Sequence, residues 1–433
     1  MNWRVLMSHL RVWRRSSIVV AAAGVVLLGL AACAPASEPG GTPSTAPETP
    51  EPYDGPVAFV GDELDLLVLE PEEIAEILPG ATGVTASSSV LMQVSDGSGP
   101  SADPRICEVF YTEHALHAVG ARVVTWSMPG AAQDVPGVLQ VLQFADEEHA
   151  RSLMDQVVQG AEQCSAFTKE AAVTFDGVAT EGDGEVRALA GTLTDNWSGT
   201  AMRTVRGYAA TGNVVTVLEA PLPDGTEVDN GDIAEAMNAR TEDARDALIE
   251  KLTATPPTEE EAPTGDASAP WSEWKISTAG VGPILLGDTL DIAKSVFPDG
   301  SVAEPEFPGG EWKATAPGAD GSILIEASGD GSKVAALTVG TRASLERPLQ
   351  EGQALPAAGE IRVGSPVAEA ISAFPGGTIV TVASSGDDWY DVATRSGRLL
   401  RFHTDRDAVD PEALIVGITA RDATMTPLPQ LGD

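Results

Sequence analysis

Apolar residues recur at two different spacings along the first half of the chain, which predicts both helices and strands. Over 146–163 they recur every three or four residues, as on one face of an amphipathic helix, and the same spacing predicts a closing helix over 232–252. A short acidic helix is predicted over 70–78, where Pro71 lies in the first turn and Pro79-Gly80 ends it. Apolar runs predict strands at 66–69, 138–144, 187–193, 200–210 and 213–220.

The second half of the chain repeats itself at an offset of 77 residues. The segment 287–300 recurs as 364–377, and Phe297/Phe374 and Trp312/Trp389 keep the offset. Each copy predicts a short strand (284–286 or 361–363), a glycine turn, a helix and three further strands. The strands lie around the two tryptophans, at 322–326 or 398–402, and at 336–341 or 414–420. We therefore expect an α+β protein: an N-terminal antiparallel sheet with helices, followed by duplicated helix-and-antiparallel-sheet units.

Two stretches rich in proline and polar residues divide the chain. Residues 33–55 predict a disordered tether, and 254–270 an acidic, proline-rich linker. They leave two folded blocks, 56–253 and 271–433, and the second holds the two copies, about 276–345 and 357–423. Because a linker separates the blocks, we expect the second block to move freely of the first.

The N-terminus carries the pattern of an exported lipoprotein. Four arginines and no acid precede the apolar stretch 18–30, which ends in Leu30-Ala31-Ala32-Cys33 and fits a lipobox. This predicts a signal peptide over 1–32 and a lipid, such as palmitate, on Cys33, which would anchor the chain on the extracytoplasmic face of the cell membrane. The alternative is an uncleaved N-terminal anchor, although the apolar stretch is short for a membrane span.

The chain is strongly acidic, with 26 Lys and Arg against 64 Asp and Glu and a net charge of −38. Removal of the predicted signal peptide takes away four arginines and no acid, which leaves 22 basic residues and a net charge of −42. Such a chain repels phosphate backbones and anionic headgroups, so nucleic acid is excluded as a partner and membrane attachment falls to the lipid.

Three cysteines are present, and Cys33 is assigned to the lipid. Cys107 and Cys164 remain as an even pair in an oxidising compartment, which predicts a disulfide. The alternative is two free thiols with a catalytic role, but neither cysteine lies in a CxxC motif or beside a histidine.

Three features of the first block occur in a fixed order: 66–67 followed by the acidic helix, Cys107 within 105–110, and the strand 138–144 that leads into the helix ending at Gln163-Cys164. In these features the block, over about residues 63–253, resembles the extracellular sensor domain of the actinobacterial kinase PknH, a fold that also occurs in stand-alone lipoproteins. The resemblance implies an α/β domain with an antiparallel sheet and a cleft that binds a ligand. The chain lacks the family's further cysteine pair.

The repeated unit resembles two other families. Its order of strand, glycine, helix and tryptophan-bearing strands over about 276–423 is similar to the tandem fold of β-lactamase inhibitor protein and, as a single unit, to the SmpA/BamE lipoproteins. This resemblance implies a sheet face that binds a protein.

Motifs that carry catalysis or hold metals are scarce. The sequence contains no G-x-S-x-G, P-loop, H-E-x-x-H or paired CxxC motif, so no enzyme activity and no cofactor are expected. His114 and His117 suit one face of a metal site, but no third ligand is evident, and two exposed polar histidines are the simpler interpretation. The acidic run 224–232 misses the spacing of a calcium loop, so no metal site is predicted.

Aromatic residues are the better candidates for binding. Trp312, Trp389 and Tyr390 lie at related places in the two copies, and large aromatics dominate binding faces. The alternative is that they pack against the helices bearing Phe297 and Phe374.

Three function hypotheses follow. The first is a lipid-anchored, non-enzymatic, sensor-like protein that binds a small molecule or envelope component, with a protein partner on the repeats. The second is a protein-interaction or inhibitor module without a small ligand. The third is an unrecognised hydrolase.

Overall fold

The computed structural model describes residues 52–93, 101–131, 135–180, 186–196, 201–258, 265–298, 300–316, 320–342 and 350–431. The predicted signal peptide, Cys33 and nearly all of the predicted tether lie outside these residues. All the described residues belong to one unit, Pro50–Asp433. In that unit no described helix is long and apolar enough to cross a membrane.

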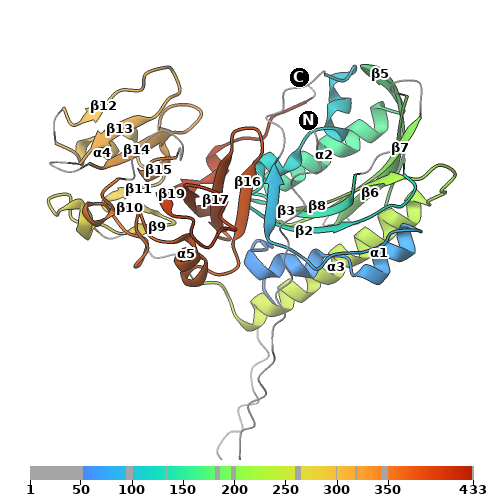
Figure 1. The fold of residues 1–433 in the computed structure, drawn as a ribbon, viewed down its shortest axis with the longest axis horizontal. Helices are drawn as coiled ribbons and strands as arrows, with labels where there is room; N and C mark the ends of the chain where they lie inside the picture. Colours follow the sequence, from blue (N-terminus) through green and yellow to red (C-terminus); the bar gives the residue numbers. More distant parts are fainter. Residues whose placement is uncertain are drawn as a thin grey trace, which may run out of the picture. The chain divides into compact units, whose positions relative to one another are not determined.

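The first block is built on a seven-stranded antiparallel sheet with the order β2-β3-β8-β7-β6-β5-β4 (Figure 1). The strands are β2 (Gly120–Trp126), β3 (Gly137–Gln143), β4 (Ala166–Lys169), β5 (Ala171–Ala179), β6 (Arg187–Asp195), β7 (Met202–Thr211) and β8 (Val214–Leu222). The predicted strands from 138 to 220 are present, and the turn between β7 and β8 has Gly212 at φ +51°, a conformation that favours glycine.

Helices cover both faces of this sheet. On one face α3 (Asn230–Ala254) packs through Ile233, Met237 and Leu248, with α1 (Pro71–Ile77) beside it; on the other face lies α2 (Glu147–Gln163) (Figure 1). The Asp146 carboxylate accepts from the His149 amide and caps α2, and Asp229 caps α3 in the same way. All three predicted helices of this block are therefore present.

One predicted strand of the first block is wrong. The apolar run 66–69 begins inside a 3₁₀ helix, η2 (Gly61–Leu67), and does not form a strand. Its Leu64 and Leu67 are buried whereas Leu66 is 37% exposed, so a three-residue spacing, and not an alternation, decides which side chains enter the core.

The second block is built on a nine-stranded sheet with the order β1-β16-β17-β18-β19-β15-β14-β13-β12 (Figure 1). Four strands follow α4 (Leu290–Ser295) and four follow α5 (Val367–Ala373), and the two sets meet at the antiparallel pair of β15 and β19. The strands are β12 (Val302–Ala303), β13 (Trp312–Thr315), β14 (Ser322–Ala327), β15 (Val334–Gly340), β16 (Thr378–Val382), β17 (Asp387–Ala393), β18 (Arg398–Thr404) and β19 (Ile415–Asp422). A small sheet of β9 (Ile276–Ser277), β10 (Gly280–Val281) and β11 (Ile284–Leu285) lies beside them; no strand forms at 361–363.

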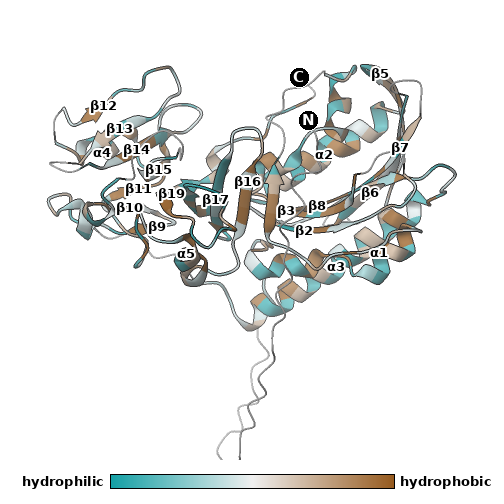
Figure 2. Ribbon diagram, in the orientation of Figure 1, coloured by the Kyte–Doolittle hydropathy of each residue, from teal (hydrophilic) through white to brown (hydrophobic). Residues whose placement is uncertain are grey.

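The ninth strand comes from the first block. β1 (Val90–Gln93) pairs in parallel with β16, with Leu91 opposite Val380. One hydrophobic cluster contains Leu91 and Phe110 of the first block together with Val380 and Trp389 of the second. Figure 2 shows β16 as largely hydrophobic and the neighbouring β17 as largely hydrophilic. The expectation that the second block moves freely of the first is therefore wrong, because a strand pairing and a common core join them. The α+β class is confirmed.

Candidate functional site at the junction of the two blocks

A cleft of about 560 Å³ lies where the two blocks meet, and we call it the junction cleft. The first block lines it with η2, Gly120, Gln143 and Lys251, and the second with the segment between α5 and β16 and the end of β17. Its volume lies within the range of small-molecule sites in proteins, roughly 300–1,000 Å³.

Glycines bring the main chain to the wall of this cleft. Gly61 and Gly376 have φ of +60° and +85°, a region that favours glycine. A Cβ on Gly376 would lie 3.3 Å from Gly61 Cα, and a Cβ on Gly377 would lie 2.3 Å from the Asp391 carbonyl oxygen. A side chain at Gly376 would crowd the contact between the two blocks, and one at Gly377 would clash inside the second block, so these glycines let the backbone line the cleft.

Gln143 supplies an unsatisfied polar group. It is 1% exposed, it lines the junction cleft, and its Nε2 has no hydrogen-bond partner among the residues that the structure describes. Gly120 lies opposite Gln143 on β2 and leaves room for the Gln143 side chain, because a Cβ on Gly120 would lie 2.4 Å from Gln143 Oε1. A buried amide donor without an acceptor costs about 1–3 kcal/mol, and an acceptor from a bound molecule would offset that cost.

Glu63 holds the two blocks together beside the cleft. Its carboxylate is 6% exposed and accepts from Arg395 at 2.5 Å, from Lys251 at 2.7 Å and from the Val60 amide at 3.1 Å. Burial raises the pKa of Glu63, but the hydrogen bonds from Arg395 and Lys251 outweigh it, so the pKa lies below its usual value. Glu63 is thus held as an anion between a cation of each block.

Arg122 holds η2 in place through hydrogen bonds to two of its aspartates. It is 4% exposed and donates to Asp62 Oδ1 at 3.0 Å and Asp65 Oδ2 at 3.3 Å. Asp62 also lines the cleft, with its side chain 85% exposed. The cleft therefore offers one buried amide donor, the ammonium group of Lys251, the carboxylate of Asp62 and stretches of open backbone.

The aromatic candidates from the sequence lie elsewhere. Trp389 is 8% exposed and Tyr390 is 2% exposed, and the Tyr390 hydroxyl lies between the Gly377 amide and the Phe374 carbonyl. Trp312 is half-buried, with Lys294 Nζ 4.1 Å from its ring centre. It lines a hollow of about 710 Å³ with Phe307, which is 66% exposed. Of the three candidates, only Trp312 borders open space.

Strand register also separates the two tryptophans. The offset of 77 links Ile325 to Phe402, but Ile325 lies opposite Trp312 whereas Phe402 lies opposite Tyr390. Trp389 therefore faces the other side of the sheet and joins the core shared with the first block. The expectation that Trp312 and Trp389 occupy equivalent places is wrong by one residue, which in a strand reverses the face.

The two sequence-predicted histidines share a 3₁₀ helix, η4 (His114–His117). His114 is 8% exposed rather than exposed as expected, and burial lowers its pKa to about 4. No group of three or more His, Cys, Asp or Glu positioned to hold a metal ion occurs within the described ranges.

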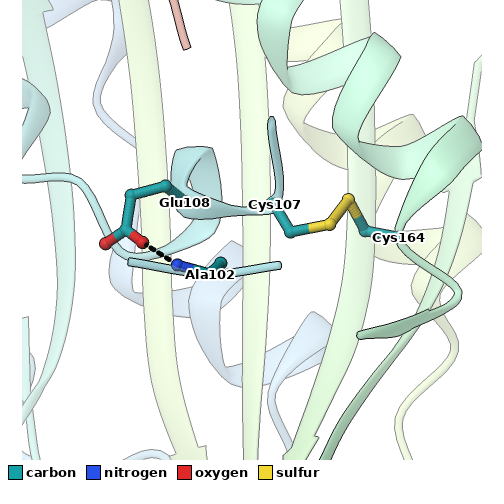
Figure 3. Close-up of a disulfide and its surroundings, with 4 residues drawn as sticks. All are labelled: Ala102, Cys107, Glu108 and Cys164. Carbon is teal, nitrogen blue, oxygen red and sulfur yellow. Dashed lines mark hydrogen bonds between the residues drawn. A yellow bond between two sulfur atoms is a disulfide. The ribbon is translucent and has the colours of Figure 1, made fainter. Parts of the chain in front are cut away.

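Cys107 and Cys164 form a disulfide (Figure 3). Cys107 lies in η3 (Arg105–Phe110), next to Glu108, whose carboxylate accepts from the Ala102 amide at 2.7 Å. Cys164 directly follows α2. The bond pins η3 to the end of α2, where Gly160 leaves room for Val109.

The comparisons with known proteins are sparse: no protein-family model and no curated protein matches the chain significantly. The extracellular domain of PknH from Mycobacterium tuberculosis aligns with 46% of this chain and 100% of its own, at a TM-score of 0.31 and 16% identity. A Mycobacterium smegmatis protein, an Rv0999 ortholog, aligns with 43% of this chain and 97% of its own, at a TM-score of 0.26 and 12% identity. Since both scores are below 0.5, neither similarity supports an argument about function.

Sequence patterns did not predict the residues that line the junction cleft. In the sequence, Gln143 is a polar residue near the end of a predicted strand, and Glu63 is one of many acidic residues. The one available signal was the Pro375-Gly376-Gly377 turn after α5, because consecutive glycines mark a place where backbones approach.

Proposed function

We propose that this protein is a non-enzymatic binding lipoprotein of the extracytoplasmic face, which takes a small polar molecule into the junction cleft. The observation that carries the proposal is Gln143 Nε2, a buried amide donor without an acceptor in a cleft of suitable size. Glycine backbone and the charges of Lys251 and Asp62 around it favour a ligand with several polar groups.

The ligand test compares two glutamine variants. The full chain, purified in detergent from its own envelope, is examined by native mass spectrometry and by extraction of bound small molecules. Gln143→Met keeps the size of the side chain and removes the donor, so we expect it to lose the bound molecule. Gln140→Met, on the opposite face of the same strand, should retain it.

Stability separates this loss from misfolding. Because Gln143→Met removes an unpartnered buried amide, the melting temperature should stay the same or rise. Recovery of no small molecule from the unaltered chain, or equal retention by Gln143→Met, would refute the proposal.

The membrane anchor is tested on its own. Cys33→Ser removes the predicted lipid acceptor, so we expect the chain to leave the membrane fraction and lose the mass of the acyl chains. If the variant stays in the membrane with an uncleaved N-terminus, the anchor is a peptide and not a lipid.

One observation supports the second candidate function, a protein-interaction module. Phe307 and Trp312 border an open hollow at the far edge of the nine-stranded sheet, where β12 has only two residues. A specific protein that co-purifies with the chain, and is lost with Phe307→Ala but kept with Val409→Ala, another exposed apolar position, would favour this function.

A further inference from the structure

Another pocket, of about 240 Å³, shares only Val119 with the lining of the junction cleft, and we call it the tail pocket. It is bordered by η4, α2, β18, β19 and the tail that follows β19. Four of its lining residues are basic in type and none is acidic: His117, His149, Arg401 and Arg421. In a chain with 64 Asp and Glu against 26 Lys and Arg, a lining with two arginines, two histidines and no acid is unusual.

Arg421 presents free donors to the tail pocket. Its Nη2 donates to Thr426 Oγ1 at 2.9 Å and lies 3.5 Å from Glu326 Oε1. Glu326 is shared with Arg342, at 2.7 Å. Neither Nε nor Nη1 of Arg421 has a hydrogen-bond acceptor within the described part of the chain. Burial, and further the neighbouring Arg401 and Arg342, lower the pKa of Arg421, an electrostatic cost that a bound anion would offset.

Arg401 is held rigidly at the same wall. It donates from Nε and Nη2 to Asp391, each at 2.8 Å, and its guanidinium lies 4.1 Å from the centre of the Trp389 ring. A guanidinium fixed in this way is already oriented for an oxyanion, since little side-chain entropy remains to be lost.

The histidines complete the pocket. His149 lies between two acceptors, Asp146 Oδ1 at 2.6 Å and the Thr426 carbonyl at 3.0 Å, so both its nitrogens are satisfied only when both carry a proton. His117 has no hydrogen-bond partner within the described ranges, and burial together with His149 lowers its pKa. An anion beside His117 would favour the charged form of its ring.

We propose that the tail pocket binds a small oxyanion of the phosphate class. The pocket has about eight times the roughly 30 Å³ that one water occupies, which is room for a phosphate group and a few waters but not for a drug-sized ligand. The donors are the guanidinium groups of Arg421 and Arg401 and the rings of the two histidines. Three carboxylates hold three of these groups in place: Glu326 contacts Arg421, Asp391 contacts Arg401 and Asp146 contacts His149.

The test measures binding of inorganic phosphate to the full chain in detergent by isothermal titration calorimetry. Arg421→Gln removes the charge with the free donors, and His117→Gln removes the unpartnered ring. Each should weaken phosphate binding about tenfold or more, because a charge-assisted hydrogen bond is lost. Arg406→Gln, an exposed arginine paired with Asp405, is the matched control and should bind as the unaltered chain does.

Melting temperatures show whether each variant is folded. If Arg421→Gln does not fold, phosphate binding by His117→Gln alone tests the site. Glycerol phosphate in place of phosphate distinguishes a free ion from a phosphate carried on a larger molecule, and binding of either supports the site. No measurable binding of phosphate or glycerol phosphate, or equal binding by all three variants, would overturn the proposal. Because Gln143→Met leaves the tail pocket intact, it should not change phosphate binding, so the two sites fail or succeed separately.

Discussion

Asp391 shows how a single side chain can hold an element of the second block in place. Its carboxylate is 1% exposed and accepts from Arg401 twice and from Trp389 Nε1 at 2.9 Å. Asp391→Ala leaves the guanidinium without its anion, so we expect a loss of about 3–5 kcal/mol in the free energy of unfolding, measured by urea denaturation.

The control for Asp391 is an exposed ion pair. Glu147→Ala breaks the pair with Arg151 on the surface of α2 and should change stability by no more than about 0.5 kcal/mol. If Asp391→Ala costs as little as this variant, the buried pair contributes nothing beyond a surface one.

The disulfide makes a second prediction at the residue scale. Cys107 and Cys164 are 57 residues apart, and closing such a loop stabilises a fold by about 4 kcal/mol in the chain-entropy model. We expect reductant to lower the melting temperature of the unaltered chain. The Cys107→Ser/Cys164→Ser variant should melt at that lower temperature with or without reductant; a melting point that reductant does not move would contradict the bond.

At the scale of elements, β1 makes the sharpest prediction. Leu91 is 1% exposed and Met92 is 51% exposed on the same strand, next to β16. Leu91→Ala removes apolar contact from the shared core at a cost of about 2–5 kcal/mol, and should speed amide hydrogen exchange in β16. Met92→Ala, the matched exposed change, should leave β16 protected. Equal exchange in the two variants would mean that Leu91 does not hold the pair together.

The local pattern of apolar residues predicted where helices and strands lie better than it predicted which strands pair. The stripe of α2 and the runs of β6, β7 and β8 fix which face of each element is apolar, so their positions follow from the sequence. The four-residue β1 has no such signal, because its pairing with β16 joins residues almost 290 apart. Trp389 was misassigned for a related reason: the sequence offset ignores a one-residue change of register.

The candidate site was predictable only in kind. A binding cleft was expected inside the first block, but 7 of the 18 residues that line the junction cleft follow position 374, and only contact between the blocks creates it. Three statements stay predictions: the duplication of the second block, the lipid anchor at the N-terminus of the chain, and the assignment of residues 63–253 to a PknH-like domain.

At the scale of the molecule, Glu63 is one of the polar links between the blocks, since Arg395 belongs to one and Lys251 to the other. The shared core and this link should make the blocks unfold together, as one transition in differential scanning calorimetry. Glu63→Gln weakens the link and should split that transition in two. Glu72→Gln, an exposed glutamate on α1, should not.

The same link carries a pH dependence whose sign follows from the pKa of Glu63. Because that pKa is lowered in the folded state, the stabilisation is fully present above the ordinary value and is lost as the pH falls through the folded pKa. The transition should therefore stay single at neutral pH and split below about pH 4.3. The Glu63→Gln variant should already show two transitions at neutral pH, so its transitions should change little when the pH falls below about 4.3. Two transitions in the unaltered chain at neutral pH would show that the blocks unfold independently, and the junction cleft would then lack a fixed wall.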